Sequence, residues 1–143
     1  INGLTGITAE ILKDAPPVEE VIKEFQEFVG SLPMVGYNAA KSDLPILADH
    51  GLDYSQQYKV DLYDEAFERR SSDLHGIANL KLQTVASFLG FQGQSHNSLE
   101  DARMTARVYE SFLESDQARE LLGAESSLSN NPFGGLDLSQ LFD

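Results

Sequence analysis

Apolar residues recur at helical spacing in two long stretches of the chain. In the first stretch, Pro17 opens a helix and Gly30 ends it. The apolar face of this helix consists of Val18, Val21, Ile22, Phe25, Phe28 and Val29, and we expect it to belong to the core. In the second stretch, alternating three- and four-residue steps join Leu99, Ala102, Ala106, Tyr109 and Leu113. Such steps indicate one face of an amphipathic helix.

Shorter patterns predict two strands and four further helices. Strands are expected at residues 34–37 and 58–63, and helices from residue 9 to the prolines at 16 and 17, at 44–50, at about 62–70 and at 79–90. Thr8 is the expected N-cap of the first of these helices, and Ser42 or Asp43 that of the second. In the helix at 79–90 the expected inward residues are Leu82, Val85, Ala86 and Leu89. The alternation of helices and strands predicts an α/β fold with a largely parallel sheet.

Composition limits the class of protein. The chain has 143 residues, of which 41% are hydrophobic, enough for one domain with its own core. It contains no Cys, which excludes disulfides and thiolate metal sites. No apolar run approaches the length of a membrane span, and no signal peptide opens the chain. We therefore expect a soluble, cytoplasmic protein.

The formal net charge of −13 argues against non-specific binding to nucleic acid, which depends on Lys and Arg neutralising phosphates. Lys41, Lys81 and Arg103 could approach phosphates, but solvated surface charge is the expected role of each. A metal-dependent site is compatible with the acidity, because it needs clustered carboxylates and its cations reverse the local sign of charge.

Three side chains are candidates for chemistry. His96 stands just before the helix that contains Leu99, and Asp101 lies in its first turn, where the helix dipole favours anionic groups. Asp43 follows the strand at 34–37 and enters a helix, the position at which open α/β sheets place their sites. The alternative interpretations are a loop histidine, a carboxylate that merely suits the dipole, and a simple helix cap at Asp43.

The spacing of these residues resembles the motifs of the DEDDh exonucleases, a family that includes the proofreading subunit of bacterial DNA polymerase III. His96-x-x-x-x-Asp101-Ala102-Arg103-x-Thr105-Ala106 is similar to the last motif of that family. The middle motif of the family is a strand that ends in Asn, followed by an Asp that begins the next helix. Asn38 and Asp43 of this chain resemble that motif. Here Asp43 stands five residues after Asn38 rather than four, Ser42 replaces a Phe, and Tyr37 replaces a common His.

The resemblance implies a ribonuclease H-like exonuclease fold and a 3′-5′ exonuclease that acts on DNA in replication proofreading or repair. It implies that His96 is the general base, and that Asp43 and Asp101 are ligands of two Mg²⁺ or Mn²⁺ ions. Asn38, and Thr8 in the Leu4-Thr5-Gly6-Ile7-Thr8 segment, would contact the substrate, which is the 3′ end of single-stranded DNA.

The other two carboxylates of the family belong to an Asp-x-Glu motif on its first strand, and this sequence contains no Asp-x-Glu. Since residue 1 is Ile rather than Met, we expect that motif upstream of Ile1. The fold would then be N-terminally incomplete, without its central first strands, and the helix at 17–29 would lack a partner. We expect weak or no activity of this chain alone.

Three interpretations remain open: the C-terminal part of an active exonuclease, an inactive exonuclease-like binding or assembly module, and an unrelated α/β protein with a chance motif. Residues 1–122 are expected to form the exonuclease-like domain, and 123–143 a disordered tail or linker. The tail ends in Leu136-Asp137-Leu138-Ser139-Gln140-Leu141-Phe142-Asp143. This end resembles peptides that dock on sliding clamps, although Gln140 is displaced from their pattern, so a clamp or a polymerase is the expected partner.

Overall fold

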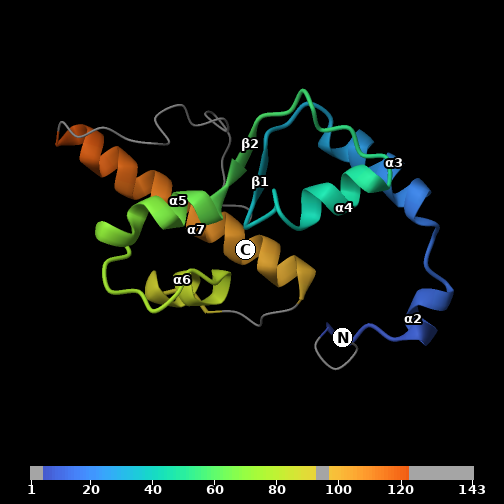
Figure 1. The fold of residues 1–143 in the computed structure, drawn as a ribbon, viewed down its shortest axis with the longest axis horizontal. Coiled ribbons are helices and arrows are strands. Elements are labelled where there is room, and N and C mark those ends of the chain that lie inside the picture. The colour runs from blue at the N-terminus through green and yellow to red at the C-terminus, as the bar shows by residue number, and fades with distance from the viewer. Residues whose placement is uncertain (1–4, 93–96, 123–143) are drawn as a thin grey trace.

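The computed structural model describes residues 5–92 and 97–122. The expected tail at 123–143, with its clamp-like end, lies outside the described residues. Helices and strands alternate as predicted (Figure 1): α2 (Ala9–Lys13), α3 (Val18–Val29), β1 (Met34–Gly36), α4 (Asp43–Asp49), β2 (Lys59–Asp61), α5 (Leu62–Glu68), the 3₁₀ turn η1 (Arg69–Ser71), α6 (Leu82–Phe88) and α7 (Ser98–Leu121). None of these helices is long and apolar enough to cross a membrane.

The two strands form a parallel pair, as the sequence predicted. Met34 lies opposite Lys59 and Gly36 opposite Asp61, and α4 lies in the connection between the strands. Both strands therefore end at the same edge of the sheet, where β1 leads into the loop at 37–42 and β2 leads directly into α5. This edge faces the long helix α7 (Figure 1).

The core lies between this sheet and the helices α5, α6 and α7. Its buried members are Val60, Leu62, Ala66, Leu74, Val85, Ala86, Met104, Val108, Tyr109, Phe112 and Leu113. In the described residues α7 contacts α5, α6 and β1, so one helix contributes to every layer of the core. Burial of this apolar surface is the main stabilising term of the fold.

The inward face of α7 differs from the predicted face in its first turns. Leu99 is 58% exposed and Ala102 is also exposed, whereas Met104, Thr105 and Val108 are buried. The first turn of α7 lies beside a cavity rather than against the core, since Ala102 lines that cavity. The face that packs against α6 and β1 is therefore set by Met104, Val108 and Phe112, at four-residue steps.

The prediction that the apolar face of α3 belongs to the core is wrong. Of its residues only Ile22 is buried, and Phe28 is 83% exposed. Phe25 lines a cavity of about 370 Å³ together with residues of α4, β1 and β2, so α3 does not close onto the sheet. The helix still forms, because Glu19 and Glu20 suit its first turn and Gly30 ends it with a φ of 55°.

The helix predicted at 79–90 begins later, at Leu82. The Asn79 side chain accepts a hydrogen bond from the Lys81 backbone N–H at 3.0 Å, and Lys81 has an extended backbone. Asn competes with helical hydrogen bonding through such local turns. The three residues before Leu82 therefore form a loop that reaches the end of β1.

A buried cluster of charges joins α5 and η1 to α7. Arg69 is 3% exposed and donates to Asp116 at 2.6 Å and to Glu65 at 2.7 Å. Its guanidinium carbon lies 4.4 Å from the centre of the Phe112 ring. A buried charge is tolerated only with such partners, so this cluster fixes where α7 sits along α5.

Candidate active site

Asp43 and Asp101, far apart in the sequence, line one cavity of about 540 Å³. The cavity lies between the carboxyl end of β1 and the first turn of α7. Its other lining residues are Val35, Gly36, Tyr37, Ser42, Leu82, Ser98, Ala102 and Thr105. Asp43 is exposed and Asp101 is half-buried, so both carboxylates are accessible to solvent. The rest of the cavity lining is mainly apolar.

Asp101 is held by the capped N-terminus of α7. Asn97 is the N-cap, and its side chain accepts hydrogen bonds from the backbone N–H groups of Leu99 at 3.1 Å and Glu100 at 3.2 Å. The Thr105 hydroxyl donates to the Asp101 carbonyl at 2.7 Å. The carboxylate thus stands on a rigid turn, where the positive end of the helix dipole stabilises it.

Asp43 is positioned by a loop that folds onto the Asp61 carboxylate. Asp61 accepts hydrogen bonds from the backbone N–H groups of Asn38 at 2.7 Å and Ala40 at 3.2 Å. It also caps α5 through the N–H of Tyr63 at 3.0 Å. Asp61 therefore connects the loop at 37–42 to the start of α5.

The extra residue between Asn38 and Asp43 is absorbed by a tight turn. Asn38 has a φ of 58°, in the left-handed region that Asn tolerates better than most residues. An added Cβ at Gly36 would come within 2.5 Å of the Ala39 Cβ, so the loop approaches β1 too closely for any side chain there. Asp43 is the first residue of α4 and not its N-cap; Ser42 occupies the cap position, but its hydroxyl donates to the Asn38 carbonyl.

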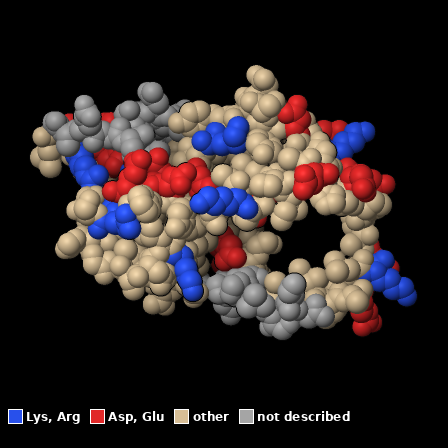
Figure 2. Space-filling model, viewed as in Figure 1, with Lys and Arg blue, Asp and Glu red and all other residues tan. Residues whose placement is uncertain are grey.

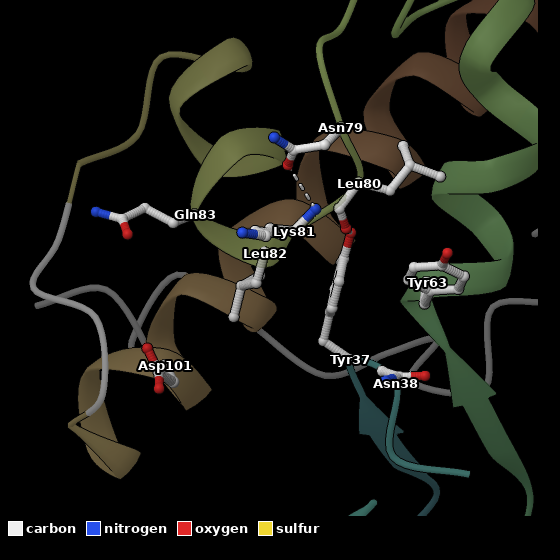
Figure 3. A pocket seen from close by; sticks show the side chains of 9 residues that line it. All are labelled: Tyr37, Asn38, Tyr63, Asn79, Leu80, Lys81, Leu82, Gln83 and Asp101. Atoms are coloured by element: carbon white, nitrogen blue, oxygen red, sulfur yellow. Dashed lines mark hydrogen bonds between the residues drawn. The ribbon is translucent and has the colours of Figure 1, made fainter. Parts of the chain in front are cut away.

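A second cavity, of about 730 Å³, adjoins the first and shares Tyr37, Leu82 and Asp101 with it. The remaining lining residues are Asn38, Tyr63, Asn79, Leu80, Lys81 and Gln83 (Figure 3). Of the predicted site residues, Asn38 and Asp101 therefore meet in this cavity, and Asp43 and Asp101 in the other.

Tyr37 stands between the two sides of the second cavity, with Asn38 and Tyr63 on one side and Gln83 and Asp101 on the other (Figure 3). Its hydroxyl donates to the Leu80 carbonyl, and its ring meets the Tyr63 ring edge-on, with centres 6.1 Å apart. Burial and the neighbouring Tyr63 and Asp61 hold the pKa of Tyr37 far above its usual range. The phenol therefore remains a hydrogen-bond donor.

The two remaining predicted site residues are His96 and Thr8. His96 falls outside the described residues, directly before the Asn97 cap in the sequence. The Thr8 side chain accepts a hydrogen bond from the Ile11 N–H at 3.3 Å, which confirms its predicted role as N-cap of α2, and Thr8 lines neither cavity.

Four residues that line the second cavity were not predicted from the sequence as site residues: Tyr37, Tyr63, Asn79 and Gln83. One local signal was available, since Asn79 stands three residues before α6 and Asn side chains often form local turns. Their convergence follows from the packing of α6 against α7 and from the hydrogen bond of Tyr37 to Leu80. Neither contact is encoded in local spacing.

Comparison with known proteins gives the family. A family model for exonucleases, RNase_T, matches residues 1–109. The DNA polymerase III subunit epsilon of Aquifex aeolicus is 30% identical over 119 residues, a match that covers 80% of this chain and 56% of that protein. The PolC-type DNA polymerase III of Clostridium perfringens is 30% identical over 109 residues, which cover 76% of this chain and 7% of that protein.

A PolC-type DNA polymerase III from Thermotoga maritima is similar at 33% identity over 116 residues, 78% of this chain and 8% of that protein. The chain thus spans about half the length of the epsilon subunit and less than a tenth of the PolC-type polymerases. No solved structure matches the chain significantly. Because the exonuclease family model matches most of its length, the chain belongs to the exonuclease family and is related to DNA polymerase III proteins.

Proposed function

We propose that this chain is part of a divalent-metal-dependent 3′-5′ exonuclease that hydrolyses DNA in replication proofreading or repair. The observation that supports this proposal best is the shared cavity of Asp43 and Asp101. Two carboxylates from separate elements at the carboxyl end of a parallel strand pair are the arrangement that a cation-dependent site requires.

The donor set fits a hard divalent cation. Mg²⁺ prefers oxygen ligands and is commonly held by one or two carboxylates together with substrate phosphates, and Asp43 and Asp101 supply such a pair. When bound, such cations lower the pKa of water and stabilise the leaving oxygen. The described residues contain no group of three or more candidate ligand side chains, so a site for two ions needs carboxylates beyond this pair.

The other proposed roles come from the family motif. His96 accepts the proton of the attacking water as general base, a role for which the ordinary pKa range of histidine is suitable. Asn38 contacts the substrate from the adjoining cavity, and Thr8 does so from the segment before α2.

Lys and Arg are few, and Figure 2 shows acidic side chains gathered over α5 and η1 and again over α3 and α4. DNA therefore approaches through bound cations rather than through a basic surface.

A binding or assembly module without activity is the second candidate. Two observations favour it: the carboxylate pair without a third ligand in the described part of the chain, and the exposed apolar face of α3. Exposed apolar surface of this kind is typical of protein contacts.

Two measurements on this chain test the proposal. The first is Mn²⁺ binding by isothermal titration calorimetry, with Asp43→Asn and Asp101→Asn as variants and Asp49→Asn, an exposed acid on the same helix α4, as matched control. We expect both site variants to weaken binding at least tenfold and the control to bind as the unaltered chain does.

The second measurement is digestion of 3′-labelled single-stranded DNA with Mn²⁺, by the chain alone and by the chain joined behind a segment with Asp-x-Glu on an apolar strand. We expect little cleavage by the first and clear cleavage by the second, lost again in Asp101→Asn. Binding of Mn²⁺ that is equal in all variants, with no cleavage in either form, would favour the assembly module instead.

A further inference from the structure

The helix α3 presents an exposed apolar strip on its outer side. Val21 is 43% exposed, and Phe28, two turns further along, is 83% exposed. Residues seven positions apart lie on the same side of a helix, so these two side chains are neighbours on one surface. Phe25 stands between them and lines the cavity of about 370 Å³ against α4 and the sheet. Val21, Phe25 and Phe28 therefore form a continuous strip, the α3 strip, that leads from the surface into a cavity.

The cavity behind the α3 strip is suited to an apolar side chain. Its volume lies in the range of small-ligand sites, about 300–1,000 Å³. The cation in its described lining is Lys59, whose ammonium group donates to the carbonyls of Tyr54 at 3.1 Å and Gln57 at 2.9 Å. Lys59 is therefore used within the chain. The apolar lining residues besides Phe25 are Met34, Val35, Leu44, Leu47 and Val60.

A row of acids runs beside the α3 strip. Glu20, Glu24 and Glu27 follow one another at steps of four and three residues, which places them on one side of the helix, next to the strip. All three are exposed, and Figure 2 shows acidic side chains gathered over α3 and α4. Lys23, the cation of α3, lies about 150° around the helix from the strip. The strip is therefore bordered by negative charge.

This charge decides which occupant fits the strip. A second copy of the chain would bring its own row of glutamates against this one, and the chain has a formal net charge of −13, so self-association is opposed. The end of the chain, residues 136–143, contains acids but no Lys or Arg, and the same repulsion opposes its docking here. The occupant that fits is apolar on one side and basic beside it.

We propose that α3 is a docking face for a basic amphipathic helix of another protein. One apolar side chain of that helix enters the cavity beside Phe25, and its Lys or Arg residues pair with Glu20, Glu24 and Glu27. A helix laid into an apolar groove is a common mode of recognition, in which the buried anchor supplies affinity and the bordering charges supply specificity. The inference goes beyond the proposed exonuclease function, and it gives the assembly module a partner of stated chemistry.

The test uses a synthetic helix of this chemistry. A fluorescent peptide as long as α3, 12 residues, carries leucines on one helical face and lysines on the other, and fluorescence anisotropy follows its binding to the full chain. A peptide of the same composition in shuffled order is the control for charge alone, because it forms no apolar face. We expect the amphipathic peptide to bind at least tenfold more tightly. Equal binding of the two peptides would overturn the proposal.

Matched apolar variants locate the contact. Phe28→Ser should weaken binding of the amphipathic peptide about tenfold, because one aromatic side chain is no longer buried by the peptide. Phe28 is 83% exposed in the free chain, so its replacement leaves the core intact. Phe88→Ser is the control, at a phenylalanine of α6 that is 45% exposed, and it should bind as the unaltered chain does. Equal binding by the two variants would overturn the proposed place of docking.

Two triple variants of equal net charge test the acidic row. In the first, Gln replaces Glu20, Glu24 and Glu27; in the control, Gln replaces three exposed acids of α5 and α7, Glu68, Glu114 and Glu120. We expect the first variant to weaken peptide binding about tenfold and to make it less sensitive to salt, and the control to change it much less. Equal effects in both would overturn the pairing with α3.

Two further measurements distinguish other occupants. Peptide binding should persist in the chain joined behind a segment with Asp-x-Glu on an apolar strand; its loss there would show that this segment covers α3 and would overturn the proposal. Sedimentation equilibrium should give a monomer, and a dimer that Phe28→Ser dissociates would assign the face to a second copy instead. DNA cleavage, present or absent, changes neither result, so this proposal and the exonuclease function can fail separately.

Discussion

The carboxylate of Asp61 joins the loop at 37–42 to the start of α5, and its removal is expected to loosen the site before it unfolds the protein. Asp61→Ala deletes the acceptor of the Asn38, Ala40 and Tyr63 N–H groups together. The first two bonds shape the loop that leads to Asp43, and the third caps α5.

The size of the effect follows from these contacts. A hydrogen bond to a charged group contributes about 1.5–3 kcal/mol when shielded from water, and an N-cap about 0.5–2 kcal/mol. Asp61 is half-buried, so water replaces part of what is lost. We therefore expect Asp61→Ala to lower the free energy of unfolding by about 2–4 kcal/mol. Asp61→Asn, which keeps one acceptor oxygen, should cost about half as much.

Urea denaturation followed by circular dichroism measures the free energy of unfolding, with Asp64→Ala as the matched control because Asp64 is an exposed acid in the first turn of the same helix. Amide hydrogen exchange adds a local reading: the N–H groups of Asn38 and Ala40 should exchange faster in Asp61→Ala, while those in the middle of α7 should not. Mn²⁺ affinity should fall as well, because Asp43 is no longer held.

An Asp61→Ala chain that unfolds at the same urea concentration as Asp64→Ala would refute the reasoning. So would unchanged exchange at Asn38 and Ala40. In either case the loop would be held by its own turn hydrogen bonds, such as that from the Leu44 N–H to the Ala39 carbonyl at 2.9 Å, and not by the carboxylate.

Three more outcomes are expected. Arg69→Ala leaves Asp116 buried without its partner at 2.6 Å and should cost about 3–5 kcal/mol of unfolding free energy in urea; the double variant with Asp116→Ala should cost less than the sum of the single variants. Gly36→Ala places a Cβ within 2.5 Å of the Ala39 Cβ and should cost about 1–3 kcal/mol, part of which Ala39→Gly restores in a melting experiment. Burial raises the pKa of Tyr109 from 10.0 to about 12, so the unfolded chain loses the phenol proton at a lower pH than the folded chain does. The stabilising contribution is therefore complete below pH 10 and is lost as the pH rises toward 12. Tyrosinate absorbance and the free energy of unfolding, measured together over this range, should show the loss, and Tyr109→Phe should remove this pH dependence.

Local rules were sufficient for the order of the elements. The Thr8 cap, the end of α3 at Gly30 and the two strands depend on neighbours in the sequence. Only the resemblance to exonuclease motifs pointed to Asp43 and Asp101 as a pair, and the exonuclease family model bears out the resemblance itself.

Features that depend on distant contacts could not be predicted. The face of α7 is set by α6 and β1, so the stripe that starts at Leu99 indicated the wrong inward direction for the first turns. The exposure of Phe28 depends on what lies beside α3, and no helical spacing contains that information. The partnership of Arg69 with Asp116 joins residues from different elements, and charged residues are expected at the surface from their type alone.

The anchoring of α7 at both ends has a consequence for how this chain can change in length. Asp101 stands at one end, and Asp116, bound to Arg69, lies roughly four helical turns away, about 22 Å. One inserted or deleted residue between them would rotate one end about 100° against the other, so that either the carboxylate leaves the cavity or the ion pair breaks. Insertions and deletions in functional relatives should therefore avoid this span. They should occur instead in segments such as residues 50–58, which join α4 to β2 without a comparable fixed register.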